Sequence, residues 1–404
     1  MRKKQPLNTR ILSLKNLKAR PVRTACLIVV VIILAFTLFG GSILALNLRQ
    51  GLATMTRRFG ADLMVVPEGA SEKAQSLLLQ GGSGYFYFDA GITGKIAGTE
   101  GIACASPQFY LTSLSTECCD AAVQLIAYDP ATDFVVQPWI AERRSGTIAD
   151  GQVVVGSRIT IRQNGTIQLF NHEYPVAAQL SESASGFDTS IFMTMNTMRN
   201  LIDQAHGEKY SFLADNYGEE VVSIVLAKVD PLKSSSQVAY NIGKQNEGVE
   251  VLISQGIFST LAAALSGLVS YIHLFSAVLW VLALIVLAAV FSGSAHERKK
   301  EFALLRILGA TRKKLIGIVL TESFLAGLAG AAGGIVLASL VVFPFSTLIS
   351  ERLELPYLDA PPFQVILLVL GSLFLSALAG PLASLYAALG ISRAETYFTM
   401  REGE

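Results

Sequence analysis

The stretch Ser294–Thr321, SAHERKKEFALLRILGATRKKLIGIVLT, decides the fold of this chain. Long apolar runs flank it on both sides, and a dense block of basic residues fills its middle. A short loop rich in lysine and arginine between two spanning helices marks the cytoplasmic side of a membrane. We therefore expect a membrane hairpin whose connecting loop lies in the cytoplasm. The basic residues of this loop are Arg298, Lys299, Lys300, Arg306, Arg312, Lys313 and Lys314.

The loop also has the pattern of a short helix. Phe302, Leu305 and Leu308 recur at helical spacing and form an apolar stripe. Gly309 supplies a helix stop, and Thr311 is a suitable N-cap for the next helix. The sequence thus predicts a short helix lying across the end of the hairpin. The alternative is a basic loop that only fixes the membrane topology.

The run ERKKEFALLRILGATRKK, residues 297–314, resembles the signature of the MacB/FtsX-type ABC transporter permeases. In that family the matching segment is the coupling helix, which docks on a separate ATPase subunit. The resemblance therefore implies a coupling role for the residues that match by position. These residues are Glu297, Arg298, Glu301, Leu305, Arg306, Gly309, Ala310 and Thr311.

The composition of the chain is that of an integral membrane protein with a sizeable soluble part. Of its 404 residues, 51% are apolar and only 16% are charged, and the mean hydropathy is +0.48. An ordinary soluble enzyme is less apolar than this. The net charge of +1 gives no overall field that would attract nucleic acid, so nucleic acid is not an expected partner.

Four apolar runs are long enough to span a membrane, since about 20 residues suffice. We expect both termini and the basic loop on the cytoplasmic side of a bacterial inner membrane, and the large region between the first two spans outside it. The predicted segments are a cytoplasmic amphipathic segment (1–21), the first span and stalk (22–59), an extracytoplasmic domain (60–255), a stalk and second span (256–293), the coupling-helix loop (294–314), the third span (315–349), a short outer loop (350–362), the fourth span (363–390) and a cytoplasmic tail (391–404).

The extracytoplasmic region is expected to be an α+β domain, as one body or two lobes. Glycine, serine, threonine, asparagine and aspartate punctuate short runs with strand-like composition there. Mixed short strands with a few helices are typical of α+β domains. The predicted strands are 62–66, 85–88, 108–114, 123–128, 152–155, 166–170, 176–180 and 221–229, and the predicted helices are 194–204 and 235–245.

The sequence offers no catalytic or nucleotide-binding motif. It lacks the phosphate-binding pattern G-x-x-x-x-G-K-[ST] and the zinc pattern H-E-x-x-H, and its four histidines are scattered. We therefore expect no enzyme activity, no metal site and no cofactor in this chain. ATP and Mg²⁺ are expected on the partner ATPase.

Two features outside the loop are candidate sites. Cys104, Cys118 and Cys119 share the large region between spans, and three readings stay open: one disulfide from Cys104 to one of the neighbouring pair, reduced buried thiols, or binding of a thiophilic metal or haem. His273 lies inside the second span, where an ionisable residue marks a functional candidate. A neutral histidine bonded to a neighbouring helix is the simpler account.

Two functions follow from the resemblance. The first is the permease subunit of an ATP-driven ABC transporter, a homodimer with two copies of a separate ATPase, which exports a hydrophobic or amphipathic substrate by transmitting motion to the extracytoplasmic domain. The second is a membrane protein that transports nothing and uses the same stroke to activate an extracytoplasmic hydrolase or a sensor. Membrane lipids and an extracytoplasmic protein are the other expected partners.

Overall fold

The computed structural model describes residues 13, 16–81, 84, 86–112, 119, 123–143, 146–207, 221–307, 309–346 and 355–393. The chain forms two compact units. The first unit, here called the membrane unit, comprises residues 1–47, 266–347 and 360–404. The second unit, here called the sheet unit, comprises residues 48–265 and 348–359.

Among the described residues, four helices are long and apolar enough to cross a membrane. Their most apolar 18-residue windows have mean hydropathies between 2.2 and 2.9. This confirms the four spans that the sequence predicts. The helices are α2 (Pro21–Phe59), α8 (Ser254–Glu297), α10 (Arg312–Val342) and α12 (Pro362–Arg393), and α12 continues through Pro381.

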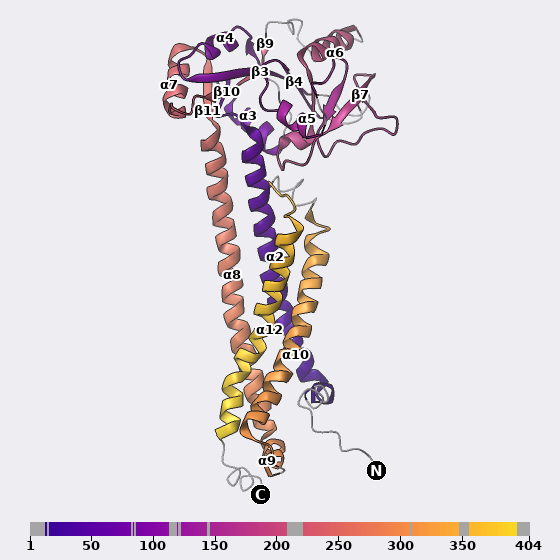
Figure 1. Ribbon diagram of the computed structural model, residues 1–404, viewed down its shortest axis with the longest axis vertical. Helices are drawn as coiled ribbons and strands as arrows, with labels where there is room; N and C mark the ends of the chain where they lie inside the picture. The colour runs from indigo at the N-terminus through magenta and orange to yellow at the C-terminus, as the bar shows by residue number, and fades with distance from the viewer. Residues whose placement is uncertain are drawn as a thin grey trace. The chain divides into compact units, whose positions relative to one another are not determined.

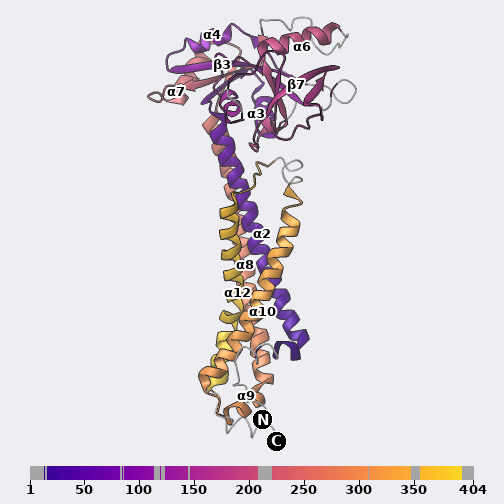
Figure 2. The same ribbon diagram turned by 45° about the vertical axis from the view of Figure 1, so that its right-hand side comes forward.

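Close packing within the membrane unit uses small residues. Helices α10 and α12 lie side by side (Figures 1 and 2). A side chain at Gly327 would place its Cβ 2.8 Å from the carbonyl oxygen of Ala377 on α12. A Cβ at Gly334 would lie 2.5 Å from the carbonyl oxygen of Ile32 on α2. The glycines of α10 therefore let its backbone approach two neighbouring helices.

The described strands of the sheet unit form one nine-stranded sheet and one two-stranded sheet. The large sheet has the order β11-β1-β10-β3-β4-β8-β5-β7-β6, in which β4–β8 and β5–β7 are parallel pairs and the others are antiparallel. Strands β2 and β9 pair separately. The strands are β1 (Leu63–Pro67), β2 (Phe88–Asp89), β3 (Ile102–Thr112), β4 (Gln124–Tyr128), β5 (Val153–Val155), β6 (Thr166–Leu169), β7 (His172–Gln179), β8 (Ser190–Thr194), β9 (Val221–Val222), β10 (Ile224–Val229) and β11 (Val249–Ile253).

Helices cover both faces of the large sheet. Successive residues of a strand point to opposite faces, so Phe109 and Tyr110 on β3 enter different cores. The core around Tyr110 is covered by α3 (Ser71–Gln80) and α5 (Gln137–Arg143). On the other face, α6 (Met195–Gly207) covers the core that contains Phe109, while α4 (Ile92–Ala97) and α7 (Ser235–Gln245) cover a separate core. Figure 1 shows α7 and α6 towards opposite ends of this sheet.

The sheet unit has the mixed composition of strands and helices that the sequence predicts between the first two spans. A 3₁₀ turn, η1 (Gly186–Thr189), precedes β8. The fold class, four apolar helices with a domain of strands and helices between the first and second, is therefore confirmed.

Candidate functional site

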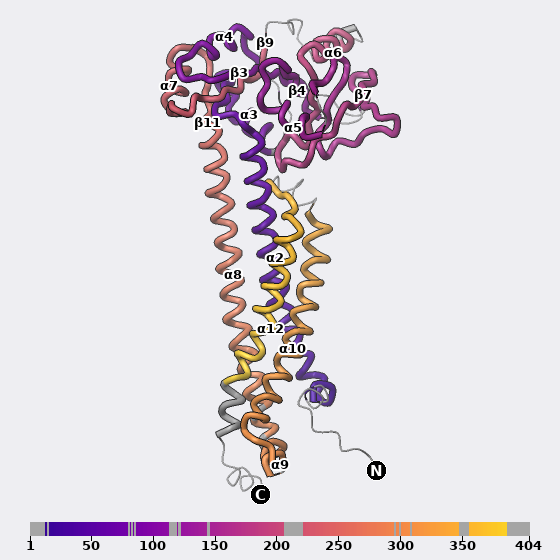
Figure 3. The backbone as a smooth tube through the Cα atoms, viewed as in Figure 1, coloured from indigo at the N-terminus to yellow at the C-terminus, as the bar shows by residue number. Residues whose placement is uncertain are grey.

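The sequence between α8 and α10 forms a sharp elbow built on the short helix α9 (Lys299–Ile307). The chain passes from α8 through α9 into α10, as the tube in Figure 3 traces. Gly309 has φ +89°, a left-handed conformation that favours glycine, and its N–H donates to the carbonyl of Arg306 at 3.0 Å. The N–H of Ala310 donates to the carbonyl of Leu305 at 2.9 Å. These bonds satisfy carbonyls at the end of α9.

Thr311 begins the next helix. It is the N-cap of α10, and its hydroxyl accepts a bond from the backbone N–H of Lys314 at 3.4 Å. The inner face of α9 is held by packing, because Phe302 and Ala303 are buried and Phe302 contacts Leu315 and Val319 of α10. Leu308 lies outside the described residues.

The outer face of α9 carries two exposed apolar side chains. Leu304 is 58% exposed and Ile307 is 63% exposed. They lie three residues apart and therefore on one side of the helix. Lys300, Glu301 and Arg306 accompany them on α9. An apolar pair with charged neighbours, on a helix whose opposite face is packed, has the character of a docking surface.

Arg298, in the turn between α8 and α9, fixes the elbow to α10. It is only 6% exposed, and its Nη1 donates to Oε2 of Glu322 at 2.8 Å. Its Nε donates to Oε2 of Glu301 at 3.1 Å, and its guanidinium lies 4.8 Å from the ring centroid of Phe302. Glu322 itself is 2% exposed. Removing one partner of such a buried pair leaves an uncompensated charge.

The N-terminal segment joins the same cluster. The side-chain amide of Asn16 donates to Oε1 of Glu322 at 2.6 Å, and Arg23 Nη2 approaches Oε2 at 3.4 Å. Arg20 bridges two acids of the elbow, reaching Glu297 at 3.1 Å and Glu301 at 2.9 Å. The cluster thus combines three arginines with three glutamates and ties residues 16–23 to α9 and α10.

The structure therefore brings the eight residues named from the sequence into one local feature, the elbow, and adds partners that the sequence reasoning missed. Glu322 carried a usable signal, because it is the only ionisable residue between Lys314 and Glu351. An acid inside an apolar span is costly and so marks a functional candidate. Arg23 likewise lies just inside the first predicted apolar run.

The other candidate residues do not meet in the structure. His273 is exposed on α8, and among the described residues no hydrogen bond or ion pair reaches it. Neither Cys104 nor Cys119 is in a disulfide bond. Cys104 lies on β3 opposite Lys228, Cys119 is buried and its sulfur accepts from the N–H of Phe170 at 3.3 Å, and Cys118 lies outside the described residues. No group of metal-ligating side chains occurs within the described ranges.

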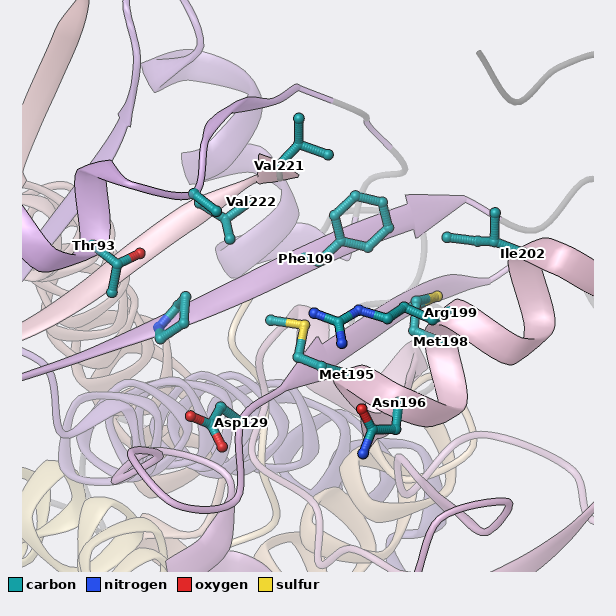
Figure 4. A pocket seen from close by; sticks show the side chains of 12 residues that line it. Thr93, Phe109, Asp129, Met195, Asn196, Met198, Arg199, Ile202, Val221 and Val222 are labelled. Atoms are coloured by element: carbon teal, nitrogen blue, oxygen red, sulfur yellow. The ribbon is translucent and has the colours of Figure 1, made fainter. Parts of the chain in front are cut away.

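A second candidate site is a pocket of about 370 Å³ in the sheet unit, between α6, β3 and β9 (Figure 4). Eight of its twelve lining residues are apolar, and Thr93, Asp129, Asn196 and Arg199 are polar. A neighbouring pocket of about 420 Å³ shares Asp129, Met195 and Asn196 and adds Asp150. The apolar lining residues are Ala90, Pro107, Phe109, Met195, Met198, Ile202, Val221 and Val222.

Two acids near these pockets differ in their electrostatic setting. Hydrogen bonds from Thr194 and Asn196 lower the pKa of Asp150, so this carboxyl stays ionised at neutral pH. Below the opposite face of the sheet, burial raises the pKa of Asp133, although backbone N–H groups of Gln137 and Val136 bond its Oδ2 at 2.7 Å.

The four apolar helices and the inserted domain of strands and helices define a multi-pass membrane protein. Residues 273–394 match the family described as FtsX-like permease C-terminal. The matched part of the chain is therefore similar to an FtsX-like permease domain, and it contains α9 and every residue predicted to couple. No curated protein matches the sequence.

Two solved structures are similar to about half of this chain. One is the periplasmic region of MacB from Actinobacillus actinomycetemcomitans, at 11% identity and a TM-score of 0.33, covering 51% of this chain and 95% of that one. The other is the extracellular domain of the noncanonic ABC-type transporter YknZ from Gram-positive bacteria, at 11% identity and a TM-score of 0.26. That match covers 48% of this chain and 98% of the other.

Proposed function

We propose that this chain is the membrane subunit of an ATP-driven ABC system and that α9 is the surface on which a separate ATPase docks. The observation that carries this proposal is the two-faced construction of α9. Its inner face is packed and paired, and its outer face exposes Leu304 and Ile307. Exposed apolar side chains at a fixed helix are the kind of anchors that fill a partner's pocket.

The contacts that hold α9 explain how a displacement of α9 by the ATPase is transmitted to the spanning helices. Arg298 and Glu322 join the elbow to α10, and Arg20 and Arg23 join it to the N-terminal segment. The helix α8 is continuous over 44 residues up to the elbow. A displacement of α9 by the ATPase therefore acts on α8, α10 and the start of α2 together. ATP and Mg²⁺ belong to the ATPase in this scheme, and this chain supplies no catalytic residue.

The proposed membrane topology follows from the position of the ATPase, which hydrolyses ATP in the cytoplasm. The elbow and both termini lie in the cytoplasm, and the sheet unit lies outside the cell membrane. We propose a homodimer with two ATPase copies that exports a hydrophobic or amphipathic substrate by motion of the sheet unit. In the described spans the acidic and basic residues gather towards the helix ends, which suits transmission of motion better than a polar channel.

Photo-cross-linking from the outer face of α9 tests this proposal. The full-length protein carries p-benzoylphenylalanine in place of Leu304, and the membranes are irradiated and then labelled with an azido-ATP probe. We expect an adduct that contains this chain and a nucleotide-labelled ATPase. The matched control has the same photoreactive residue in place of Ile285, which is 60% exposed on α8 within the span.

Cross-linking at 304 and not at 285 supports the docking surface. An ATPase adduct from both positions, or from neither, contradicts it.

A further inference from the structure

We propose that a groove between α10 and α12 binds one anionic phospholipid, with an acyl chain in the groove and the phosphate group at Lys313 and Lys314. The groove belongs to the membrane unit alone, and the proposal goes beyond the docking role of α9. In the proposed topology α10 begins in the cytoplasm, so the lipid is one of the inner leaflet. Only this choice of leaflet rests on the proposed function.

The groove is a hollow of about 660 Å³ beside a close contact of two helices. Five residues of α10, beginning at Gly317, line one side, and Leu378 and Pro381 of α12 line the other. One residue along from lining positions in both helices, a Cβ at Gly380 would lie only 2.6 Å from the carbonyl oxygen of Ser323. Backbone packing therefore fixes the two walls. Gly317 has no side chain, and a Cβ there would meet no neighbouring atom within 4 Å, so the hollow stays open.

The lining of the groove is apolar and needs no polar partner from a ligand. Thr321 is the one polar residue among the seven described residues that line it. The hydroxyl of Thr321 donates to the carbonyl oxygen of Gly317 at 2.7 Å and is thereby satisfied within its own helix. Phe324 is 42% exposed, and Leu320 and Leu325 are partly buried. Such a lining suits a hydrocarbon chain, because a polar group placed there would lose its hydrogen bonds to water without replacement.

The length of the groove matches one leaflet of a bilayer. From Gly317 to Leu325 the helix rises about 12 Å, at about 1.5 Å per residue. Half of the hydrocarbon core of a bilayer is about 15 Å thick. The groove begins four residues after Lys313, near the start of α10. It therefore covers the depth that an acyl chain occupies below its head group.

Two lysines flank the end of the groove at the start of α10. At about 100° per residue, Lys313 lies roughly 40° to one side of Gly317 and Lys314 roughly 60° to the other. Both lysines are exposed, and among the described residues neither side chain has a hydrogen bond or an ion pair. Arg312 lies roughly 140° from Gly317 and thus on another face of the helix. An anion at this end of the groove would therefore meet two ammonium groups.

An apolar groove that ends at two free lysines identifies the class of ligand. Basic pockets between spanning helices on the cytoplasmic side bind the head groups of anionic lipids. A spanning helix of a second copy would fill the groove but bring no anion to the lysines. A soluble phosphate would meet the lysines but not use the groove. An anionic phospholipid satisfies both parts.

Native mass spectrometry of the full-length protein in detergent, with no ATPase present, tests this site. The probe is palmitoyl-oleoyl-phosphatidylglycerol. It is compared with phosphatidylcholine of the same two chains and with dihexanoyl-phosphatidylglycerol, which carries the same head group on short chains. We expect the first molecule of the probe to bind about tenfold more tightly than either comparison lipid.

A double variant tests the two lysines. Lys313→Gln combined with Lys314→Gln should weaken binding of the long-chain phosphatidylglycerol about tenfold and leave binding of phosphatidylcholine unchanged, because phosphatidylcholine has no net charge. Arg312→Gln is the matched control, since it removes an exposed charge from the same turn on another face of the helix. It should change the binding of neither lipid.

A variant that fills the groove tests the acyl-chain site. Gly317→Leu places a side chain in the hollow and should weaken both long-chain lipids about tenfold, because both use the groove. Gly371→Leu is the matched control. Gly371 lies in α12 outside the lining, and a Cβ there also meets no neighbouring atom within 4 Å, so this change should have no effect.

Equal affinity of the wild-type protein for the two long-chain lipids overturns the proposal. Equal affinity for the short-chain and long-chain phosphatidylglycerols overturns it as well, because the site would then hold a phosphate without using the groove. Unchanged phosphatidylglycerol binding by either the double lysine variant or Gly317→Leu also contradicts it. Because no ATPase takes part, these results leave the docking role of α9 unaffected, and failure of the cross-link at residue 304 leaves the lipid site unaffected.

Discussion

Two carboxylates, one buried in the membrane unit and one partly buried in the sheet unit, show two ways of holding an acid away from water. Glu322 in the membrane unit is 2% exposed and is held by side chains from distant parts of the chain, Arg298, Arg23 and Asn16. Asp133 in the sheet unit is held by two backbone N–H groups just after it in sequence. Among the described residues no salt bridge includes Asp133.

The difference teaches what each acid does. A carboxylate that gathers donors from three segments holds those segments in one arrangement. Its loss removes the buried counter-charge of Arg23 and leaves Arg298 with only the half-exposed Glu301. A carboxylate bonded chiefly by the backbone N–H groups that follow it caps its own turn, and burial raises its pKa. Glu322 therefore serves the assembly of the elbow, whereas Asp133 serves one loop.

The largest expected effect is that of Glu322→Gln. Arg298 and Arg23 lose their buried counter-charge, so we expect a loss of about 3–5 kcal/mol in the free energy of unfolding. Equilibrium unfolding of the protein in lipid nanodiscs measures this loss. The matched control is Glu297→Gln, because Glu297 pairs with Arg20 but its side chain is 70% exposed, and we expect a change below about 0.5 kcal/mol.

A double variant measures the interaction energy between Arg298 and Glu322 apart from the effect of each single substitution. Arg298→Gln combined with Glu322→Gln should cost clearly less than the sum of the two single changes, because it leaves fewer uncompensated charges. Additive costs would show that the pair does not act as a unit. Equal stability of Glu322→Gln and wild type would remove Glu322 as the anchor of the elbow.

The next effect concerns the backbone of the elbow. Gly309→Val forces a β-branched residue into φ +89°, and we expect a cost of about 1–3 kcal/mol together with displacement of α9. Unfolding experiments give the cost, and spin labels at Leu304 and Ile285 measure the displacement as a changed distance distribution. Gly293→Ala is the control, since Gly293 lies within α8 and a Cβ there meets no atom within 4 Å. An unchanged distribution in Gly309→Val would show that the turn does not need glycine.

The smallest expected effect is the change in the pH dependence of stability caused by Asp133→Asn. Its folded pKa is raised, so its contribution to stability is fully present below its ordinary value of 3.8 and is lost as the pH rises through the folded pKa. Relative to the wild type, Asp133→Asn should therefore gain stability as the pH rises from 4 to 7, by about 1.4 kcal/mol for each unit by which the pKa is raised. Unfolding as a function of pH measures this difference.

Asp150→Asn is the matched control for that measurement. Hydrogen bonds from Thr194 and Asn196 lower the pKa of Asp150, so the stability that it contributes is lost as the pH falls through that lowered value. Between pH 4 and 7, Asp150→Asn should therefore show no pH-dependent change in stability relative to the wild type, and its slope, opposite in sign to that of Asp133→Asn, should appear only below pH 4. A slope of the same sign as that of Asp133→Asn would contradict the assignment of the two carboxylates.

Much of the fold follows from local sequence pattern. The apolar runs predict four spans, and the basic loop with Gly309 and Thr311 predicts the short helix of the elbow. The sheet unit was predicted less completely. Strand β3 begins at Ile102, six residues before the predicted start at Gln108, because Ala, Cys, Ser and Pro residues give a weak strand signal that pairing with β10 overrides. All five residues of β8 are buried, so it shows no alternation and was missed.

The partners of the elbow could not be predicted in the same way. Asn16 and Arg23 lie 306 and 299 residues from Glu322, and no periodicity joins residues at such a separation. The pocket in the sheet unit is likewise assembled from α6, β3, β9 and the loop after β4. For the elbow, the sequence signal was Glu322, an isolated acid within an apolar span.

The most direct test of the central claim, that α9 receives the ATPase, is the rate of ATP hydrolysis by the reconstituted complex. Leu304→Glu places a charge in the middle of the exposed apolar face, and Leu232→Glu makes the same change at a residue of the sheet unit that is 92% exposed. We predict that Leu304→Glu lowers the stimulated rate about tenfold or more while Leu232→Glu leaves it unchanged. Full stimulation by a folded Leu304→Glu protein would contradict the claim.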